Sequence, residues 1–343
     1  MNIIAIETSC DETSVSVISN GYKVISLCTA SQIKTHAEHF GVIPEIASRE
    51  HVKNINFVLQ QALNSAKITF TDFYEKISAV AFTVGPGLKG ALLIGNAFSR
   101  SLSYIYNKPL IPINHLEGHI FSSFIGNKNK IHFPFLSLII SGGHTELIIV
   151  KNFGIYERIG STRDDAVGEA FDKVARILKL SYPGGPIIDI KSEKGNPNII
   201  HFTRPYLRNS WDFSFSGIKT AVLNYVKKNY IDFKDEKLIS NICASFRQAI
   251  AETLHFKSFK LAKKLNIKQI VLGGGVSANY LIRKMFLESG KKNRIKVIMP
   301  NYIYCTDNAA MIGYIAYFKL KLYGKKYSKE QLKTNASLML ENW

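Results

Sequence analysis

Two stretches of the chain, residues 2–19 and 135–152, follow one plan: an apolar run, a polar turn and a second apolar run. They read NIIAIETSCDETSVSVIS and FLSLIISGGHTELIIVKN. A shift of 132 positions places Ser9 on Ser141 and superimposes one threonine as well. Apolar runs of this length around a polar turn predict β-strands. A duplicated unit predicts two related lobes that face each other across a cleft, although two identities in a short hairpin can also arise by chance.

The rest of the chain alternates between further strands and helices. We expect a buried strand over 77–84, a Gly-Pro-Gly turn, and a helix over about 90–105. Helical spacing of apolar residues predicts another helix from about residue 164, which stops at the Pro-Gly-Gly-Pro run 183–186. A strand, a loop and a helix follow over 268–286. This alternation predicts an α/β fold, and 343 residues exceed the usual size of a single core.

The chain is strongly basic, with a formal net charge of +18. Such a charge attracts polyanions such as RNA, but a composition rich in Lys, Ile and Asn also explains it without any partner. The longest apolar stretch, Phe135–Val150, is too short and too polar for a membrane span. The N-terminus lacks a signal or transit pattern, and the four scattered cysteines suit a reducing compartment. We therefore expect a cytoplasmic protein without a membrane partner.

Two glycine-rich loops are candidate ligand sites. The sequence GGGVSAN, which contains Gly273, Gly274 and Gly275, follows an apolar strand and is expected to open a helix whose N-terminal amides bind phosphate. Ala278 breaks the dinucleotide fingerprint, and the GPGLKGA sequence lacks the Gly-Lys-Ser/Thr of a P-loop. The SGGHT sequence beginning at Ser141 exposes amides and hydroxyls in a tight turn. Tight strand-to-helix packing and a plain hairpin turn are the respective alternatives.

Acidic residues gather in the turn of the first hairpin, ETSCDET. Glu7, Asp11 and Glu12 lie within six positions of one another. Carboxylates beside a phosphate loop commonly bind a cation or position a water molecule, although turn propensity alone also explains Asp11.

His115 and His119 are four residues apart in the sequence INHLEGHI, so a helix would place both on one face. The pair is either a set of metal ligands or an ordinary surface helix. The order His-Leu-Glu-Gly-His differs from His-Glu-x-x-His, so Glu117 is misplaced for the general base of a zinc protease. Asp307, at the start of an apolar helix, is a candidate third ligand or a helix N-cap.

Taken together, nine motifs in order give the chain a resemblance to the bacterial TsaD family along nearly its whole length. They are ETSCDET, GPGLKGALLIG, NHLEGHI, SGGHTEL, DDAVGEAFDKVA, YPGGP, DFSFSGIKTA, GGGVSAN and CTDNAAMI. The chain departs from the family pattern at Ala309, where glycine is usual, and at Ser99-Arg100, where Ala-Lys is common.

The resemblance implies the two-lobed α/β fold of the actin, sugar kinase and chaperone ATPase superfamily, with duplicated βα lobes. It divides the chain into an N-terminal lobe (1–130), a C-terminal lobe (131–300) and C-terminal helices (301–343) that pack back on the first lobe. It also implies an acyltransferase that moves threonylcarbamoyl from threonylcarbamoyl-AMP to N6 of the adenosine just 3′ of the anticodon in tRNAs that read codons starting with A.

Site residues follow from the matching motifs. The resemblance implies one Fe²⁺ per subunit on His115, His119 and Asp307, and the same donors are compatible with Zn²⁺. Asp11 and Glu12 are candidate catalytic groups. The implied substrate-binding positions are Ile139, Ile140, Ser141, Gly142, Gly143, Asp172, Gly185, Asp189 and Asn279.

The family is expected to work with tRNA, a TsaB-like paralogue and a TsaE-like ATPase. Two other functions stay open. An ATP-dependent kinase of the same fold would need a catalytic acid beside a sugar hydroxyl, and a nonenzymatic RNA-binding scaffold would need only the positive charge. Lysine-rich segments at 288–296 and 319–326 are candidate tRNA contacts.

Overall fold

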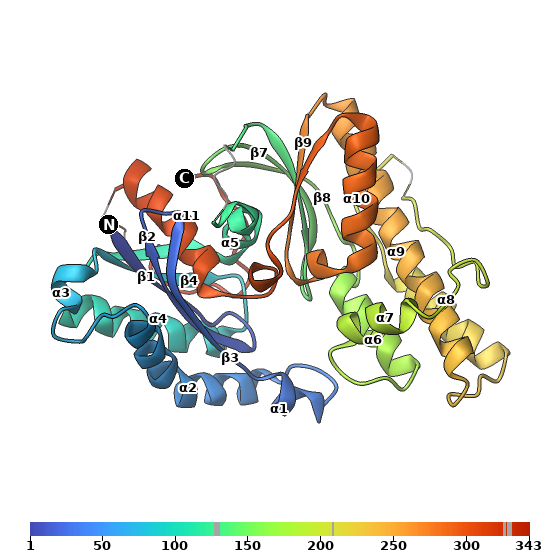
Figure 1. Ribbon diagram of the computed structural model, residues 1–343, viewed down its shortest axis with the longest axis horizontal. Helices are drawn as coiled ribbons and strands as arrows, with labels where there is room; N and C mark the ends of the chain where they lie inside the picture. Colours follow the sequence, from blue (N-terminus) through green and yellow to red (C-terminus); the bar gives the residue numbers. More distant parts are fainter. Residues whose placement is uncertain (127–130, 208, 325–326, 328–330) are drawn as a thin grey trace. The chain divides into compact units, whose positions relative to one another are not determined.

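A computed structural model describes the chain except residues 127–130, 208, 325–326 and 328–330 (Figure 1). The described residues form two compact units. Unit 1 comprises Met1–Ile131, Asn152–Ile155 and Pro300–Trp343, and unit 2 comprises His132–Lys151 and Tyr156–Met299. The predicted lobe boundary at residue 130 and part of the 319–326 segment lie outside the described residues.

Unit 1 is built on a five-stranded sheet with the order β3-β2-β1-β4-β5. The strands are β1 (Asn2–Glu7), β2 (Glu12–Ser19), β3 (Lys23–Ser31), β4 (Ala79–Gly85) and β5 (Leu110–Asn114). The pairs β1–β2 and β2–β3 are antiparallel, whereas β1–β4 and β4–β5 are parallel. The carboxyl ends of β1, β4 and β5 therefore lie at one edge of the sheet.

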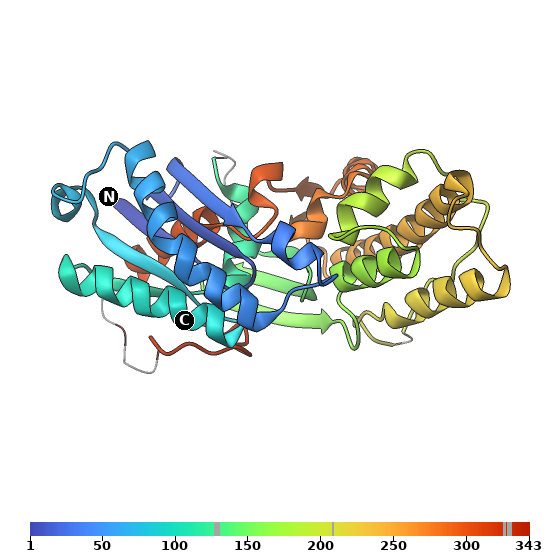
Figure 2. The same cartoon turned by 90° about the horizontal axis from the view of Figure 1, so that it is seen from below.

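Helices cover both faces of this sheet. They are α1 (Ile33–Ala37), α2 (Pro44–Ser65), α3 (Phe73–Lys76), α4 (Lys89–Ile105), α5 (His115–Phe121) and α11 (Ala309–Leu322), with short 3₁₀ turns at Ser122–Phe124 and Tyr302–Tyr304. Ile4 and Ile6 of β1 share a core with α2, while Ala5 lies on the other face, against Gly313 of α11. The helices α2 and α4 lie side by side on the first face (Figures 1 and 2).

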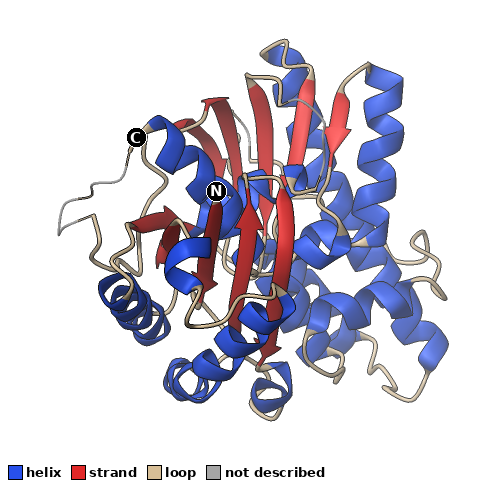
Figure 3. Cartoon of the chain, turned by 60° about the vertical axis from the view of Figure 1, so that its left-hand side comes forward, coloured by secondary structure: helices blue, strands red, loops and turns tan. Residues whose placement is uncertain are grey.

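Unit 2 repeats this architecture with a sheet of order β10-β9-β6-β7-β8. Its strands are β6 (Phe135–Ile140), β7 (Thr145–Asn152), β8 (Ile155–Ser161), β9 (Gln269–Gly273) and β10 (Lys296–Ile298). Its helices are α6 (Val167–Ile177), α7 (Gly184–Ser192), α8 (Ser216–Lys228), α9 (Glu236–Lys264) and α10 (Tyr280–Asn293), with a 3₁₀ turn at Gly275–Ala278. Figure 3 distinguishes the strands of the two sheets from the helices. Leu136, Leu138 and Ile140 of β6 share one core with α6, α9 and α10.

The predicted duplication is confirmed by the strand pairing. Read outward from the central strand, β1 or β6, both sheets have the same strand order, and each central strand has one antiparallel and one parallel neighbour. The register also matches the shift of 132 positions, because Ile3 pairs with Ile18 and Phe135 pairs with Val150. A single slip would turn every side chain to the opposite face, so the shared register is strong evidence against chance.

One helix boundary differs from the prediction. The helix α6 ends at Ile177, six residues before the Pro-Gly-Gly-Pro run, and Lys179 takes a left-handed conformation with φ of 56° just after it. Pro183 instead precedes α7, which begins at Gly184. Proline fixes a backbone φ that suits the start of a helix, so the run begins one helix rather than ending another.

Two further observations concern cysteines and membranes. All four cysteines are free thiols. Among the helices in the described part of the chain, none combines the length and the apolar composition needed to cross a bilayer.

Candidate metal centre and ligand loops

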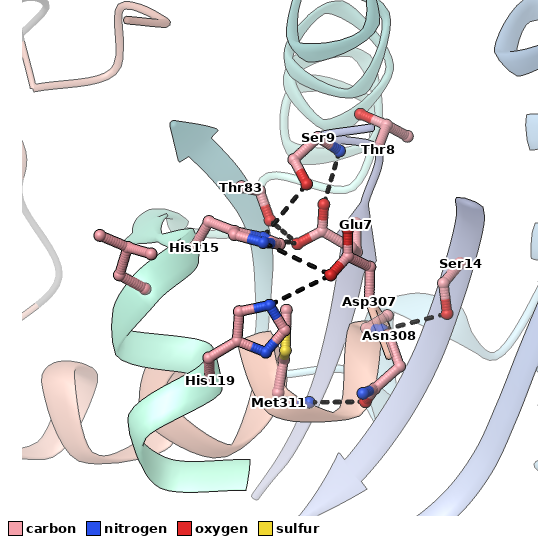
Figure 4. A network of polar contacts seen from close by, with 12 residues as sticks. Glu7, Thr8, Ser9, Ser14, Thr83, His115, His119, Asp307, Asn308 and Met311 are labelled. Atoms are coloured by element: carbon pink, nitrogen blue, oxygen red, sulfur yellow. Dashed lines mark hydrogen bonds and ion pairs between the residues drawn. The ribbon is translucent and has the colours of Figure 1, made fainter. Parts of the chain in front are cut away.

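His115 and His119 both lie on α5, immediately after β5. Asn114 caps the helix, because its side chain accepts a hydrogen bond from the backbone N–H of Leu116 at 2.9 Å. The two histidines are 5% and 0% exposed, and their ring centroids are 4.6 Å apart. The alternative of a surface helix is therefore wrong, since both imidazoles converge in the interior of unit 1 (Figure 4).

Asp307 completes a three-residue cluster with these histidines. Its Oδ1 lies 3.1 Å from Nε2 of His119 and 3.5 Å from Nε2 of His115. One donor atom from each residue lies within 4.8 Å of the others. The N-cap alternative for Asp307 is wrong, because the next residue, Asn308, caps α11 by accepting from the N–H of Met311 at 3.1 Å.

Glu7 and Ser9 hold the far side of the His115 ring. The Nδ1 of His115 lies 3.0 Å from Glu7 Oε2 and 3.1 Å from Ser9 Oγ. Glu7 is completely buried and also accepts hydrogen bonds from Thr83 Oγ1 at 2.6 Å and from the N–H of Ser9 at 2.5 Å. A carboxylate on Nδ1 leaves Nε2 facing the cluster, which is the arrangement found behind metal-bound histidines. The sequence grouped Glu7 with the acids of the turn but gave no sign of this partner.

Charges in the cluster shift several pKa values. Burial opposes the charged form of His115, but Asp307 and Glu7 outweigh it and raise its pKa to about 9. Burial also opposes ionisation of Glu7, yet the charge and hydrogen bond of His115 keep the pKa of Glu7 below its usual value. Burial and the neighbouring His115 lower the pKa of His119. The Nδ1 of His119 has no hydrogen bond to a described residue, and its Nε2 contacts only the Asp307 carboxylate among them. A buried imidazole whose free nitrogen faces a carboxylate in this way fits a cation-binding site.

Asp11 and Glu12 lie in the turn between β1 and β2 and at the start of β2. His51 of α2 fixes this turn, because its Nδ1 lies 2.7 Å from Thr13 Oγ1 and its Nε2 lies 3.0 Å from the carbonyl oxygen of Cys10. Burial and the charge of Asp11 raise the pKa of Glu12 well above its usual value, and Asp307 contributes as well. The acidic turn is thus electrostatically linked to the histidine cluster.

In unit 2, the SGG turn follows β6. A side chain added at Gly142 or Gly143 would meet no atom within 4 Å, so ligands can approach these two backbones. The N–H of Gly168, at the start of α6, donates to the carbonyl oxygen of Ser141 at 3.1 Å. Ile139 and Ile140 are fully buried in β6, so only their backbones are available to a ligand.

The second glycine loop has a packing requirement. Gly274 has φ of +89°, and a Cβ there would lie 2.5 Å from the carbonyl oxygen of Ile140. The 3₁₀ turn Gly275–Ala278 separates the loop from α10, so the loop does not open that helix directly as expected. Tight packing, the alternative to ligand binding, is therefore sufficient to explain why residue 274 is a glycine.

The remaining substrate-binding candidates join α6, α7, α9 and α10. Asp172 accepts from the N–H of Gly184 at 2.7 Å, and Gly185 beside it has open space. Asp189 accepts from Asn279 Nδ2 at 2.8 Å and from Arg247 Nη1 at 2.6 Å. Arg247 gave no signal in the sequence, because the 58 positions to Asp189 span several elements.

The profile of the family described as "TsaD: tRNA N6-adenosine threonylcarbamoyltransferase" matches residues 23–314. The chain belongs to this family. A relative in Endomicrobium trichonymphae named tRNA N6-adenosine threonylcarbamoyltransferase is 65% identical and covers 100% of this chain and 99% of its own length. A relative of the same name in Clostridioides difficile (strain 630) is 48% identical over 92% of both chains. As a tRNA N6-adenosine threonylcarbamoyltransferase, this chain is a transferase that modifies tRNA.

Solved structures identify the fold of the family member. HypF of T. kodakarensis superposes with a TM-score of 0.65 at 12% identity, covering 96% of this chain and 49% of HypF. An activator of 2-hydroxyisocaproyl-CoA dehydratase from Clostridium difficile, solved with bound ADPNP, gives 0.54 at 15% identity, covering 96% and 100%. The two duplicated units and these neighbours confirm the actin-like ATPase fold.

Alanine substitutions distinguish a glycine that is required for packing, Gly274, from one that leaves room for a ligand, Gly142. We expect Gly274→Ala to lower the free energy of unfolding by about 1–3 kcal/mol, because it combines a left-handed φ with a backbone clash. Gly142→Ala should change it by less than about 0.5 kcal/mol, since the new Cβ meets open space. Urea unfolding of both variants measures the difference, and equal losses would contradict it.

Proposed function

We propose that the donor substrate is threonylcarbamoyl-AMP and that the acceptor is the adenosine just 3′ of the anticodon in tRNAs that read codons starting with A. The family name supports the acyl group and the N6 acceptor. An acyl-adenylate is a mixed anhydride that its AMP leaving group already activates. The enzyme then has to align the amine with the carbonyl and stabilise developing charge, which suits fixed donors better than a strong nucleophile.

Unit 1 is proposed to hold one Fe²⁺ per subunit on His115, His119 and Asp307, with Zn²⁺ compatible with the same donors. The observation that supports this most is the convergence of three donors, two of them buried histidines on one helix face and the third a partly exposed carboxylate. When bound, such an ion acts as a Lewis acid on substrate oxygens. Glu7 and Ser9 would keep the His115 ring in the required tautomer and orientation.

The acidic turn is proposed to handle the proton of the reaction. The N6 amine attacks the carbamoyl carbon, a C–N bond forms, the anhydride C–O bond to AMP breaks, and the amine loses a proton. A carboxyl group with a raised pKa is closer to neutral pH and can exchange that proton, which makes Glu12 the better of the two candidates. Asp11 is proposed to orient the amine or Glu12.

Unit 2 is proposed to bind the adenylate. The backbone amides of Gly142 and Gly143 are accessible donors for its phosphate. The open backbone at Gly185 would admit another part of the nucleotide. Asp189 and Asn279 are already bonded to each other, so their proposed role is to hold α7 and α10 in place around the ligand.

The two other functions are less well supported. A kinase would not need buried imidazoles beside Asp307, and a scaffold would need neither that cluster nor the open glycine turn. Phosphorylation of a small molecule without tRNA modification would favour the kinase. We further propose that the enzyme acts in the cytoplasm with a TsaB-like paralogue and a TsaE-like ATPase, and reconstitution with and without those two proteins tests the partners.

Elemental analysis tests the metal centre. We expect about one Fe²⁺ per chain after anaerobic loading, and loss of both the metal and tRNA modification in His119→Ala and Asp307→Ala, because each removes one of three donors. His39→Ala, at an exposed histidine of unit 1, is the matched control and should retain the metal. Undiminished modification by a His115→Ala, His119→Ala double variant would show that the metal role is wrong.

The ends of α9 and α10 form a basic surface that is proposed to contact tRNA. Its exposed residues are Lys260, Lys263, Lys264, Lys268, Lys291, Lys292, Arg294 and Lys296. Each lacks an ion pair with any residue in the described part of the chain. The N–H of Lys296 donates to the carbonyl oxygen of Lys268 at 2.8 Å, so the segments that end these helices meet. Glu288 is the one acidic residue within 260–268 and 288–296.

This surface lies at the opposite edge of the sheet from the glycine loops. The helix α10 has 14 residues and spans about 21 Å, roughly the length of six base pairs of duplex. A tRNA is long enough to contact both edges.

Neutralising the basic surface tests it. Replacing Lys264, Lys268, Lys291 and Lys292 by alanine should flatten the slope of log K against log salt for tRNA by roughly 3, since each phosphate contact contributes about 0.7–0.9. A control variant with four exposed lysines of unit 1 replaced, Lys23, Lys34, Lys53 and Lys67, has the same net charge and should keep the original slope. Equal changes in both variants would point to overall charge rather than to this surface.

A further inference from the structure

Residues 331–343, here called the C-terminal segment, are bonded to the elements that carry the histidine cluster. The N–H of Asn335 donates to the carbonyl oxygen of Val84 at 3.0 Å, and the N–H of Gly87 donates to that of Ala336 at 3.1 Å. These bonds join the segment to the end of β4 and to the Gly-Pro-Gly turn. Further along, the segment reaches α5 itself.

Glu117 is the contact in the middle of α5. It lies two residues from each histidine, about 200° around the helix from one and 160° from the other, so it faces away from the imidazoles. Its side chain is 1% exposed, and its Oε1 accepts a hydrogen bond from the indole Nε1–H of Trp343. Burying a carboxylate is costly unless it is hydrogen-bonded, so this bond ties the segment to the back of the metal-binding helix.

Asn114 is the contact at the start of α5. Its Oδ1 caps the helix through Leu116, while its Nδ2 donates to the carbonyl oxygen of Met339 at 2.9 Å. The segment is therefore bonded to the residue that caps the helix and to a residue in its first turn. Two contacts on so short a helix restrain its position.

Trp343 is held from two further directions. Its backbone N–H donates to the carbonyl oxygen of Gly154 at 2.9 Å. The ammonium group of Lys319, on α11, lies 5.4 Å from the indole ring centre and also donates to the carbonyl oxygen of Pro112 at 3.2 Å. Asp307, the third donor, lies just before α11. Lys319 therefore connects this same helix to Trp343.

A cavity of about 550 Å³ lies beside the segment and is lined by Asn114, Glu117, Lys319, Asn335, Met339 and Trp343 among others. The segment contacts this region through the hydrogen bonds of Asn114 and Glu117 next to open space, whereas α5 itself also packs against α11. Because the packing of α5 against α11 would remain, we expect loss of one such hydrogen bond to shift α5 without unfolding unit 1.

We propose that the C-terminal segment braces α5 and that Glu117 and Trp343 are positioning residues for the metal centre. The inference rests on the proposed metal role. Ligands must be held within about 0.5 Å and 10–20° for tight coordination, so a small rotation of α5 would weaken binding at both histidines. Glu117 thus has a role in the HLEGH sequence although it does not face the cluster.

Metal affinity tests the brace. Trp343→Phe keeps an aromatic ring beside Lys319 but removes the N–H donor, and we expect it to weaken Fe²⁺ binding about 10-fold, as loss of an orienting partner does. Affinity is measured anaerobically by competition with a chromogenic chelator, and unfolding midpoints are measured in parallel on metal-free protein. Glu117→Gln keeps an acceptor oxygen and should lose less than about threefold, whereas Glu117→Ala should match Trp343→Phe.

Trp211→Phe is the matched control, because Trp211 is the other tryptophan and lies in unit 2. It should bind Fe²⁺ with the original affinity. In a double-mutant cycle, the variant that combines Trp343→Phe with Glu117→Ala should bind Fe²⁺ no more weakly than either single variant, because both substitutions remove the same hydrogen bond.

Two results would overturn the brace. The first is that Trp343→Phe changes neither the Fe²⁺ affinity nor the unfolding midpoint. The second is that Trp343→Phe lowers the unfolding midpoint but leaves the Fe²⁺ affinity unchanged, which indicates a purely structural role. His119→Ala separates this failure from failure of the metal proposal. If His119→Ala loses the metal while Trp343→Phe keeps it, the brace alone is wrong, and if His119→Ala binds as tightly as the unaltered chain, the metal centre is wrong.

Discussion

The candidate metal centre depends on the contact between the fully buried carboxylate of Glu7 and the ring of His115. This carboxylate accepts hydrogen bonds from Thr83 at the end of β4 and from the N–H of Ser9, and it contacts His115 at the start of α5. Three elements far apart in sequence therefore meet at one side chain. Because a buried charge without partners costs several kcal/mol, these partners cannot separate independently. The orientation of the His115 ring is consequently fixed by the central strand of the sheet.

The duplication shows how one backbone plan supports two chemistries. Both hairpins have the same register, yet the first carries Cys10, Asp11 and Glu12 at the positions where the second carries Gly142, Gly143 and His144. Strand pairing is set by backbone bonds and by the apolar face, and neither depends on the residues at the tip of the turn. The tips were therefore free to differ, with acids that create a negative field in unit 1 and accessible amides in unit 2.

Sequence reasoning succeeded where a property is local and failed where it depends on tertiary partners. The spacing of His115 and His119 placed both on one helix face, and the apolar runs predicted the strands of both hairpins, since periodicity reports which side is buried. Asp307 and Asn308 are adjacent polar residues before one helix, and no local rule says which of them caps it. That choice is made by the path of the chain. The roles of His51, Arg247 and Glu117 were equally invisible, because each contacts a residue more than 35 positions away.

Electrostatics explains how a basic chain can carry a candidate cation site and still attract a polyanion. The net charge of +18 acts at long range and draws RNA toward the surface, but salt screens it within about 8–10 Å. Inside unit 1 the local field has the opposite sign. Cys10 and Glu12 both have pKa values raised well above normal, by burial first and then by the charges of Asp11 and Asp307. The contribution of these two charges has the direction expected of a negative potential near the histidine cluster, despite the positive surface charge. A divalent cation at the proposed site would be attracted by these charges, because nearby buried charges act through a low dielectric, whereas the distant lysines act through water.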